Sequence, residues 1–172
     1  MSVKDFVQQR RDALIAMRRD FHMYPEPAWL EYRSAAKVAD RLISLGYDVA
    51  LGADVLDLDS RMGLPSDEVM KAAMDRAIEE GANLELVEKM GYGKTAIVAT
   101  MKFGGEGPVV AFRVDMDSND VIEAKEDSHV PTKKGFRSCH DKAMHACGHD
   151  AHMTMGLGLA EYLAAHKDEL KG

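Results

Sequence analysis

The sequence predicts an α/β fold in which helices pack on a mixed β-sheet, and three observations support this class. Apolar residues recur at helical spacing in several segments, and three short runs are predicted to be strands, of which residues 95–101 are rich in β-branched side chains. Helices and strands are interleaved along the chain, as in layered α/β domains. The 172 residues are 46% hydrophobic and 30% charged, which is typical of a globular protein.

The first half of the chain is expected to contain helices and one strand. The first helix ends before Pro25, because proline cannot continue a helix. The second ends at Gly46, and residues 47–51 form a strand. After a loop, Ser66 caps a third helix, and residues 83–90 form another helical turn or two. The expected buried stripes are Val7, Leu14, Met17 and Phe21, then Ala35, Val38, Leu42 and Leu45, then Met70, Ala73 and Ala77.

The second half is expected to supply two strands and a final helix. Residues 95–101 are rich in β-branched side chains, and residues 109–114 are almost continuously apolar. Such a run predicts a strand buried on both faces, as in the middle of a sheet. The final helix is expected over about residues 150–166, with Met155, Leu159, Tyr162 and Leu163 facing inward.

Charge and composition exclude several classes of function. With 22 basic and 29 acidic residues the net charge is −7, which disfavours nucleic acid and anionic membrane surfaces as partners. No apolar run approaches the roughly 20 residues of a membrane helix, and the charged N-terminus lacks a signal-peptide core. Two cysteines do not indicate a disulfide framework. We therefore expect a cytoplasmic protein.

A phosphate-binding loop is a first candidate site, because Gly93-Lys94-Thr95 resembles the end of such a motif. The motif also needs a glycine at position 88, which is Glu88 here. A strand, not a helix, is expected after Thr95. The tripeptide is therefore interpreted as a turn that enters a strand.

Residues 144–152 carry a dense group of metal-binding side chains. Cys147 and His149 are separated by one glycine, so both can reach one ion, and thiolate and imidazole are common zinc ligands. Asp150 follows as a helix cap or as an acceptor for a ligating imidazole. In the alternative interpretation, Cys147 packs as a small apolar residue and the histidines lie at the surface. A structural zinc knuckle of Cys139, His140, Cys147 and His149 is a weaker possibility, because its spacing lacks paired CxxC or CxxH motifs.

Two further carboxylates are predicted at the carboxyl end of the strand over residues 109–114. Asp115 and Asp117 lie two positions apart, so both can point the same way. Ligands of open α/β sheets bind at this end of the strands. The alternative is a solvated loop with a helix cap, since aspartate favours turns.

The segments 112–117 and 144–150 together resemble the signature of M20-type metallopeptidases of the aminoacylase/amidohydrolase branch. The likeness extends from about Asp12 to the C-terminus. Residues 60–65 and the following helix resemble an insertion, over about residues 60–90, in a subgroup of aminobenzoyl-glutamate utilisation proteins. The other matching residues are Arg18 to His22, Pro25, Glu26, Glu31, Gly91 to Thr100, Ser128 and His129.

The resemblance implies a zinc-peptidase-like (phosphorylase/hydrolase-like) catalytic domain. It implies hydrolysis of the amide of p-aminobenzoyl-glutamate or related N-acyl amino acids, with a metal-activated water attacking the carbonyl. Two divalent ions, Mn²⁺ or Zn²⁺, would be bound, with Cys147 shared between them and His149 bound to one. The residues expected to line the site or support its ligands are Asp115, Asp117, His145, Asp150 and His152.

The sequence also departs from the family pattern. Ser118-Asn119-Asp120 replaces the usual Ala-Leu-Pro or Ala-Leu-Asp. The family's general-base glutamate, a second ligating glutamate and the lid or dimerisation domain are expected beyond Gly172. Residues 1–172 are thus expected to form the N-terminal portion of a catalytic domain that is inactive alone and works as a homo-oligomer or with a related subunit. The alternative is a truncated, non-enzymatic paralogue that binds metal or a partner.

Overall fold

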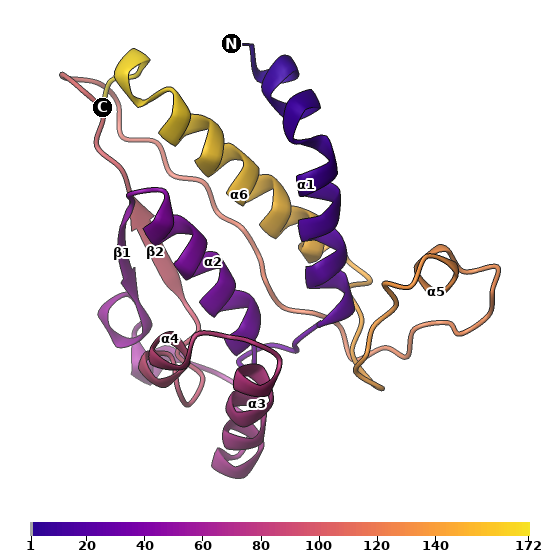
Figure 1. Ribbon diagram of the computed structural model, residues 1–172. Helices are drawn as coiled ribbons and strands as arrows, with labels where there is room; N and C mark the ends of the chain where they lie inside the picture. Colours follow the sequence, from indigo (N-terminus) through magenta and orange to yellow (C-terminus); the bar gives the residue numbers. More distant parts are fainter. Residues whose placement is uncertain (1) are drawn as a thin grey trace.

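A computed structural model describes residues 2–172 (Figure 1). Helices dominate; two short 3₁₀ turns lie between β1 and α3, and a third follows α6. The helices are α1 (Val3–Met23), α2 (Tyr32–Ser44), α3 (Asp67–Glu79), α4 (Leu84–Lys89), α5 (Val130–Lys133) and α6 (His149–Ala165). The strands are β1 (Asp48–Leu51) and β2 (Ile97–Thr100), and the 3₁₀ turns are Gly52–Asp54, Leu58–Ser60 and Lys167–Glu169.

The helices and the strand of the first half form where the local sequence predicts them. Val7, expected on the buried stripe of α1, is instead 48% exposed, because Phe6 is the residue that packs against α6. The side chain of Ser66 accepts a hydrogen bond from the Val69 amide and caps α3, as expected. Gly46 and Gly81 follow α2 and α3 with φ angles of +85° and +88°, a left-handed conformation that suits glycine and ends a helix. The expected loop contains two 3₁₀ turns, over Gly52–Asp54 and Leu58–Ser60.

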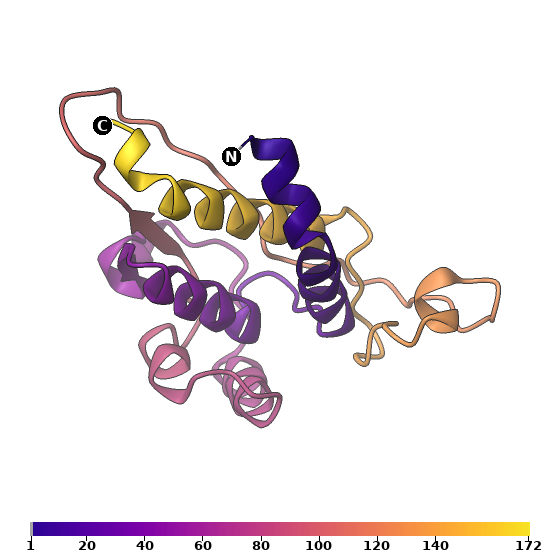
Figure 2. The same ribbon diagram turned by 45° about the horizontal axis from the view of Figure 1, so that its top comes forward.

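Two hydrophobic clusters hold the helices together. In the first, α2 packs on α3, α4 and the two strands through buried residues such as Tyr32, Ala36 and Met90. In the second, Phe21 of α1 contacts α6. Helices α1 and α6 lie side by side and antiparallel, since Phe6 stacks edge-on against Tyr162 near one end (Figures 1 and 2). The second cluster comprises Phe21, Met153 and Leu157.

The sheet is smaller than predicted. Strands β1 and β2 pair antiparallel, with Asp48 opposite Thr100 and Leu51 opposite Ile97, and form a two-stranded sheet. The prediction of a buried strand over residues 109–114 is wrong for this chain. Val109 is 98% and Phe112 is 64% exposed, and this segment forms no ladder. A buried strand needs neighbours for its backbone groups, and residues 2–172 supply none there.

The buried face of α6 also differs from the prediction. Met155, expected to face inward, is 63% exposed, whereas Met153, Leu157 and Ala160 are buried. The helix carries apolar residues of its own on several sides, so periodicity alone did not define one buried face. The contacts with α1 and α2 decide it.

The loop between β2 and α6 contains a short helix, α5, that the sequence pattern did not predict. The part of this loop that contains α5 projects beyond the end of the α1–α6 pair, whereas the segment that follows β2 runs back alongside α6 (Figures 1 and 2). Over residues 2–172, no helix is both long enough and apolar enough to cross a bilayer.

Candidate metal centre

Two loop segments meet beside the start of α6. Asn119 and Met144 exchange backbone hydrogen bonds of 2.9 and 3.0 Å. The amide of Ser118 donates to the carbonyl of Glu26 at 2.8 Å, which ties the same segment to the turn between α1 and α2. The aspartates that precede Ser118 are therefore held next to the first turn of α6.

Three of the predicted site residues converge at this place. Asp115, His149 and His152 each offer a ligand atom, and these atoms all lie within 4.8 Å of one another. The two histidines lie three positions apart on α6, so they share one face of the helix, and their rings stack with centroids 5.2 Å apart. Nδ1 of His152 is 3.9 Å from Oδ2 of Asp115.

The orientation of His149 is set by Asp117. Nδ1 of His149 lies 2.8 Å from the backbone carbonyl oxygen of Asp117 and 3.1 Å from its carboxylate. A carbonyl oxygen can only accept, so Nδ1 carries the proton and donates it. The lone pair of Nε2 is then free to bind a cation, which is the arrangement typical of metal-ligating histidines.

Asp115 is also engaged outside the cluster. Its Oδ1 forms a 2.6 Å ion pair with Arg113, whose side chain is 84% exposed. Such solvent-exposed pairs contribute little free energy, roughly 0–1 kcal/mol, because water screens them. A divalent ion can therefore compete with Arg113 for this carboxylate.

Cys147 precedes His149 by two positions but lies outside the group of three. Cys147 is exposed, so it does not pack as a small apolar residue in the core. Its backbone amide donates to Oδ1 of Asn119 at 3.1 Å, so the unusual asparagine of the Ser118-Asn119-Asp120 segment holds the Cys147 loop. The assignment of Cys147 as a metal ligand stays a prediction.

His145 is a buried histidine whose two ring nitrogens have no hydrogen-bond partner among residues 2–172. Burial lowers its pKa to about 4; the charges of Asp150 and Asp117 oppose this shift, whereas His22 and His149 add to it. The imidazole is therefore uncharged at neutral pH. A buried polar group without a partner is unfavourable, so its ring nitrogens are available to a ligand or to a further group.

The donors present fit a divalent metal ion. The carboxylate of Asp115, from a loop, and the two imidazoles of the first turn of α6 form a ligand set that Zn²⁺ and Mn²⁺ both accept. The unpartnered nitrogens of His145 lie in the same part of the fold, two positions before Cys147. We therefore describe this group as a candidate metal centre.

Asp150 does not take either of its expected roles. It neither caps α6, whose N-cap is Gly148, nor accepts from His149. Instead its buried carboxylate lies 2.8 Å from Nδ1 of His22 and 2.8 Å from Nε of Arg18. Because α6 packs antiparallel to α1, Asp150 reaches α1 rather than its sequence neighbour.

His22 continues this buried network. Its Nε2 lies 2.8 Å from Oε1 of Glu123, and His129 reaches the same oxygen at 2.8 Å. Burial alone would lower the pKa of His22, but the hydrogen bonds to Asp150 and Glu123 outweigh it and raise that pKa. Glu123 was not predicted from the sequence; the only sign was the family match of the segment that contains His22.

The segment Gly93-Lys94-Thr95 is a turn that enters β2, as interpreted. The Gly93 amide donates to the hydroxyl of Tyr32 at 2.9 Å, and the Thr95 hydroxyl donates to Glu31 at 2.7 Å. The Gly93 amide and the Thr95 hydroxyl, which a phosphate loop would offer to its ligand, are thus already hydrogen-bonded within the protein. The Glu31 carboxylate beside them would repel a phosphate.

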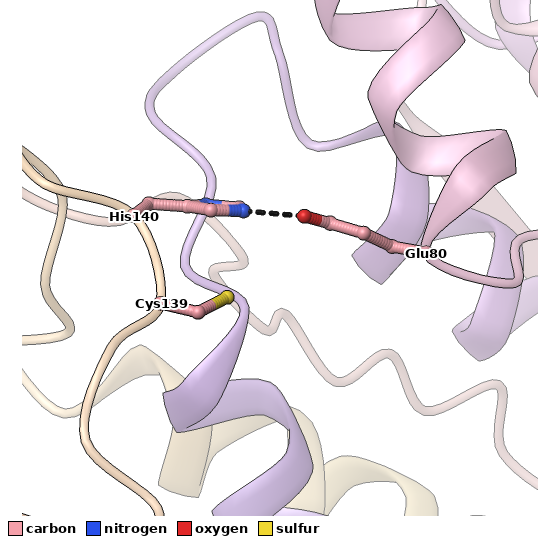
Figure 3. Close-up of side chains that lie close together, drawn as sticks. All are labelled: Glu80, Cys139 and His140. Carbon is pink, nitrogen blue, oxygen red and sulfur yellow. Dashed lines mark hydrogen bonds and ion pairs between the residues drawn. The ribbon is translucent and has the colours of Figure 1, made fainter.

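A second group of metal-binding side chains lies outside this centre. Ligand atoms of Glu80, Cys139 and His140 also lie within 4.8 Å of one another (Figure 3). The possible zinc knuckle of Cys139, His140, Cys147 and His149 is therefore split, since His149 groups with Asp115 and His152 instead. Glu80 was not predicted from the sequence, because only the tertiary fold brings it to Cys139.

Comparison with known proteins identifies the class of protein to which this fold and site belong. Residues 111–172, which contain the candidate metal centre, match the sequence model of peptidase family M20/M25/M40. This part of the chain is therefore similar to the M20 peptidases.

Two curated relatives are 45% identical to the chain. One is the indole-3-acetyl-aspartic acid hydrolase of Enterobacter agglomerans, aligned over 170 residues. The other is a p-aminobenzoyl-glutamate hydrolase subunit from Escherichia coli, aligned over 171 residues. Each alignment covers 99% of this chain but 39% of the relative. The chain thus spans about two fifths of the length of these proteins.

Two solved structures share the fold. An aminobenzoyl-glutamate utilization protein from Klebsiella pneumoniae matches with a TM-score of 0.80 and 38% identity, over all of this chain and 37% of that one. The Bacillus subtilis YXEP protein, described as a dinuclear metal-binding peptidase of the M20 family, matches with a TM-score of 0.60 and 27% identity, over 98% of this chain and 34% of that one.

Proposed function

We propose that the chain is the N-terminal portion of a metal-dependent amide hydrolase. The convergence of Asp115, His149 and His152 carries this proposal, because it supplies carboxylate and imidazole ligands at one point. The match of residues 111–172 to the M20 family model and the relatives named as hydrolases support it. Residues 60–90, which include α3 and α4, are the proposed insertion.

The residues of the site are proposed to bind metal ions or to position the residues that do. Asp115, His149 and His152 hold a divalent ion, Mn²⁺ or Zn²⁺, and Cys147 would be shared with a second ion. Asp117 orients His149 through the hydrogen bond to Nδ1. A bound divalent ion supplies Lewis acidity: it polarises a carbonyl oxygen and lowers the pKa of water. Asn119 keeps the Cys147 loop against this site.

The proposed substrate class is an N-acyl amino acid, with p-aminobenzoyl-glutamate as the first to test. The names of the two 45%-identical relatives specify an aromatic acyl group joined to glutamate or aspartate. Both compounds contain an amide next to a free carboxylate. We infer that the complete enzyme cleaves an amide of this kind.

The isolated chain is proposed to be inactive, because it spans only 39% of its relatives and the family's general-base glutamate is expected in the remainder. The test mixes the chain with a polypeptide matching the rest of the E. coli relative, with Mn²⁺, and measures p-aminobenzoate release. We expect no release from the chain alone, release from the mixture, and none when the chain carries His149→Ala. Hydrolysis by the pure chain, or an inactive mixture of two folded and associated polypeptides, would contradict the proposal.

A second candidate function, a partner-binding module, is favoured by the apolar segment 109–114. Val109 is 98%, Val110 65% and Phe112 64% exposed, and contiguous exposed apolar surface marks interaction sites. In this case the chain would bind a related M20 subunit without generating turnover. Phe112→Ser should abolish that association in sedimentation velocity, whereas the substitution of the exposed Val69 by serine should not. Association that persists in Phe112→Ser would exclude this segment as the binding surface.

A further inference from the structure

Glu80, Cys139 and His140 come from two distant parts of the chain. Glu80 is the C-cap of α3, whereas Cys139 and His140 belong to the loop that leads to α6. The side chains of Glu80 and His140 point at each other, and the sulfur of Cys139 lies to one side of their contact (Figure 3). This group shares no residue with the candidate metal centre.

The contact between His140 and Glu80 requires a proton or a metal ion between the two side chains. Nδ1 of His140 lies 2.7 Å from the carbonyl oxygen of Pro25, so Nδ1 must carry a proton and donate it. Nε2 then faces Oε1 of Glu80 at 2.7 Å. A bare lone pair facing a carboxylate is repulsive, so either a proton or a metal ion must lie between these two atoms.

The second carboxylate oxygen of Glu80 is free to accept a ligand. Its Oε2 atom is buried and has no hydrogen-bond partner within residues 2–172. Buried carboxylate oxygens are unfavourable when unpaired, and a cation satisfies them. The neighbouring positive groups are Arg33 and Arg76. Burial and the charge of Glu80 raise the pKa of the Cys139 thiol, and the two arginines partly oppose that rise. Neither guanidinium hydrogen-bonds to the Glu80 carboxylate.

We propose that Glu80, Cys139 and His140 form a zinc-binding site separate from the candidate metal centre. Zn²⁺ takes sulfur, nitrogen and oxygen ligands in tetrahedral geometry at about 2.0–2.3 Å, which places neighbouring ligand atoms about 3.4 Å apart. The His140–Glu80 contact needs to open by less than about 1 Å to reach this spacing. Water would occupy the fourth position.

The site would join the proposed insertion to the active-site loop. Glu80 ends α3, and the loop that follows His140 contains Cys147 and leads into α6. Zinc at this position would clamp the two segments together. A thiolate ligand favours Zn²⁺ over Mn²⁺, which is why zinc is the ion proposed for this site.

The test isolates this site by removing the other one. In a chain carrying His149→Ala and Cys147→Ser, Cys139 is the one remaining cysteine of two. We expect it to bind one equivalent of Zn²⁺ in equilibrium dialysis, and Co²⁺ to give thiolate charge-transfer absorption. Zn²⁺ should slow alkylation of Cys139 at least tenfold. Cys139→Ser should abolish binding, and Glu80→Gln or His140→Gln should weaken it at least about tenfold, as expected for loss of a ligand.

Glu79→Gln is the matched control, because Glu79 is the neighbour of Glu80 on α3 and belongs to neither group. It should bind zinc like its parent. Zinc binding unchanged by Cys139→Ser would overturn the proposal. The proposal would also be overturned if Cys139→Ser abolished zinc binding while Glu80→Gln and His140→Gln left it unchanged. That result would mean that the Cys139 thiol binds zinc without the other two residues. Peptide mapping of alkylation in the unsubstituted chain, with and without Zn²⁺, gives the same decision if the doubly substituted chain fails to fold.

Discussion

Nδ1 of His149 donates a hydrogen bond to the backbone carbonyl of Asp117 at a distance of 2.8 Å. This one contact links the aspartate segment to the first residue of α6 and fixes which ring nitrogen is free. Because the acceptor is a backbone atom, the orientation does not depend on the ionisation of the Asp117 carboxylate. The candidate centre is thus preorganised before a metal binds.

His149→Ala should lower the affinity of the chain for Mn²⁺ at least about tenfold, since a ligand is lost. Mn²⁺ is chosen because Asp115, His149 and His152 offer oxygen and nitrogen ligands, whereas the proposed zinc site needs the Cys139 thiolate, which disfavours Mn²⁺. Isothermal titration calorimetry measures the affinity. His129→Ala is the control, since His129 bonds to Glu123 and lies in neither ligand group. Equal Mn²⁺ affinities for His149→Ala and the parent would remove His149 from the centre.

Asn119→Leu should loosen the Cys147 loop, because leucine cannot accept the hydrogen bond from the Cys147 amide. Loss of one such bond lowers the free energy of unfolding by about 0.5–1.5 kcal/mol. Urea unfolding measures this loss, and hydrogen exchange should show faster exchange at the Cys147 amide. The exposed neighbour Asp120 gives the control Asp120→Leu. Unchanged exchange at Cys147 would show that the asparagine does not hold the loop.

Glu26 should make stability depend on pH. It is fully buried, and burial raises its pKa to about 7, although the amides of Arg33 and Ser34 donate to its two oxygens. A raised acid pKa means that the folded state holds the proton more tightly. Its contribution is complete below about 4.5 and is lost as the pH rises through 7, by roughly 3 kcal/mol at most.

Urea unfolding of the parent and of Glu26→Gln from pH 4.5 to 8 measures this contribution. The glutamine variant cannot ionise, so the parent should lose stability relative to it as the pH rises. The exposed Glu106→Gln should follow the parent at every pH. Parallel curves for the parent and Glu26→Gln would show that Glu26 does not titrate in this range.

Local signals in the sequence were sufficient where structure depends on neighbours in the chain. Ser66 caps α3 and Gly81 follows its end because capping and left-handed turns involve residues only a few positions apart. The convergence of Asp115 with His149 was also accessible, since metal-binding residue types and a recognisable family pattern mark both segments. The prediction of a strand over residues 109–114 was wrong, because a strand there needs pairing partners that residues 2–172 do not supply.

The order of residues along the chain is enough to specify the helices, their caps and the supply of metal-binding side chains. Which of these side chains meet depends on how the helices pack. Packing separates Cys139 and His140 from His149 and joins them to Glu80, 60 positions before His140. It also pairs Asp150 with His22 across the α1–α6 contact rather than with the adjacent His149. The two levels differ because backbone propensity acts over a few residues, whereas buried charges take the partner that packing brings to them.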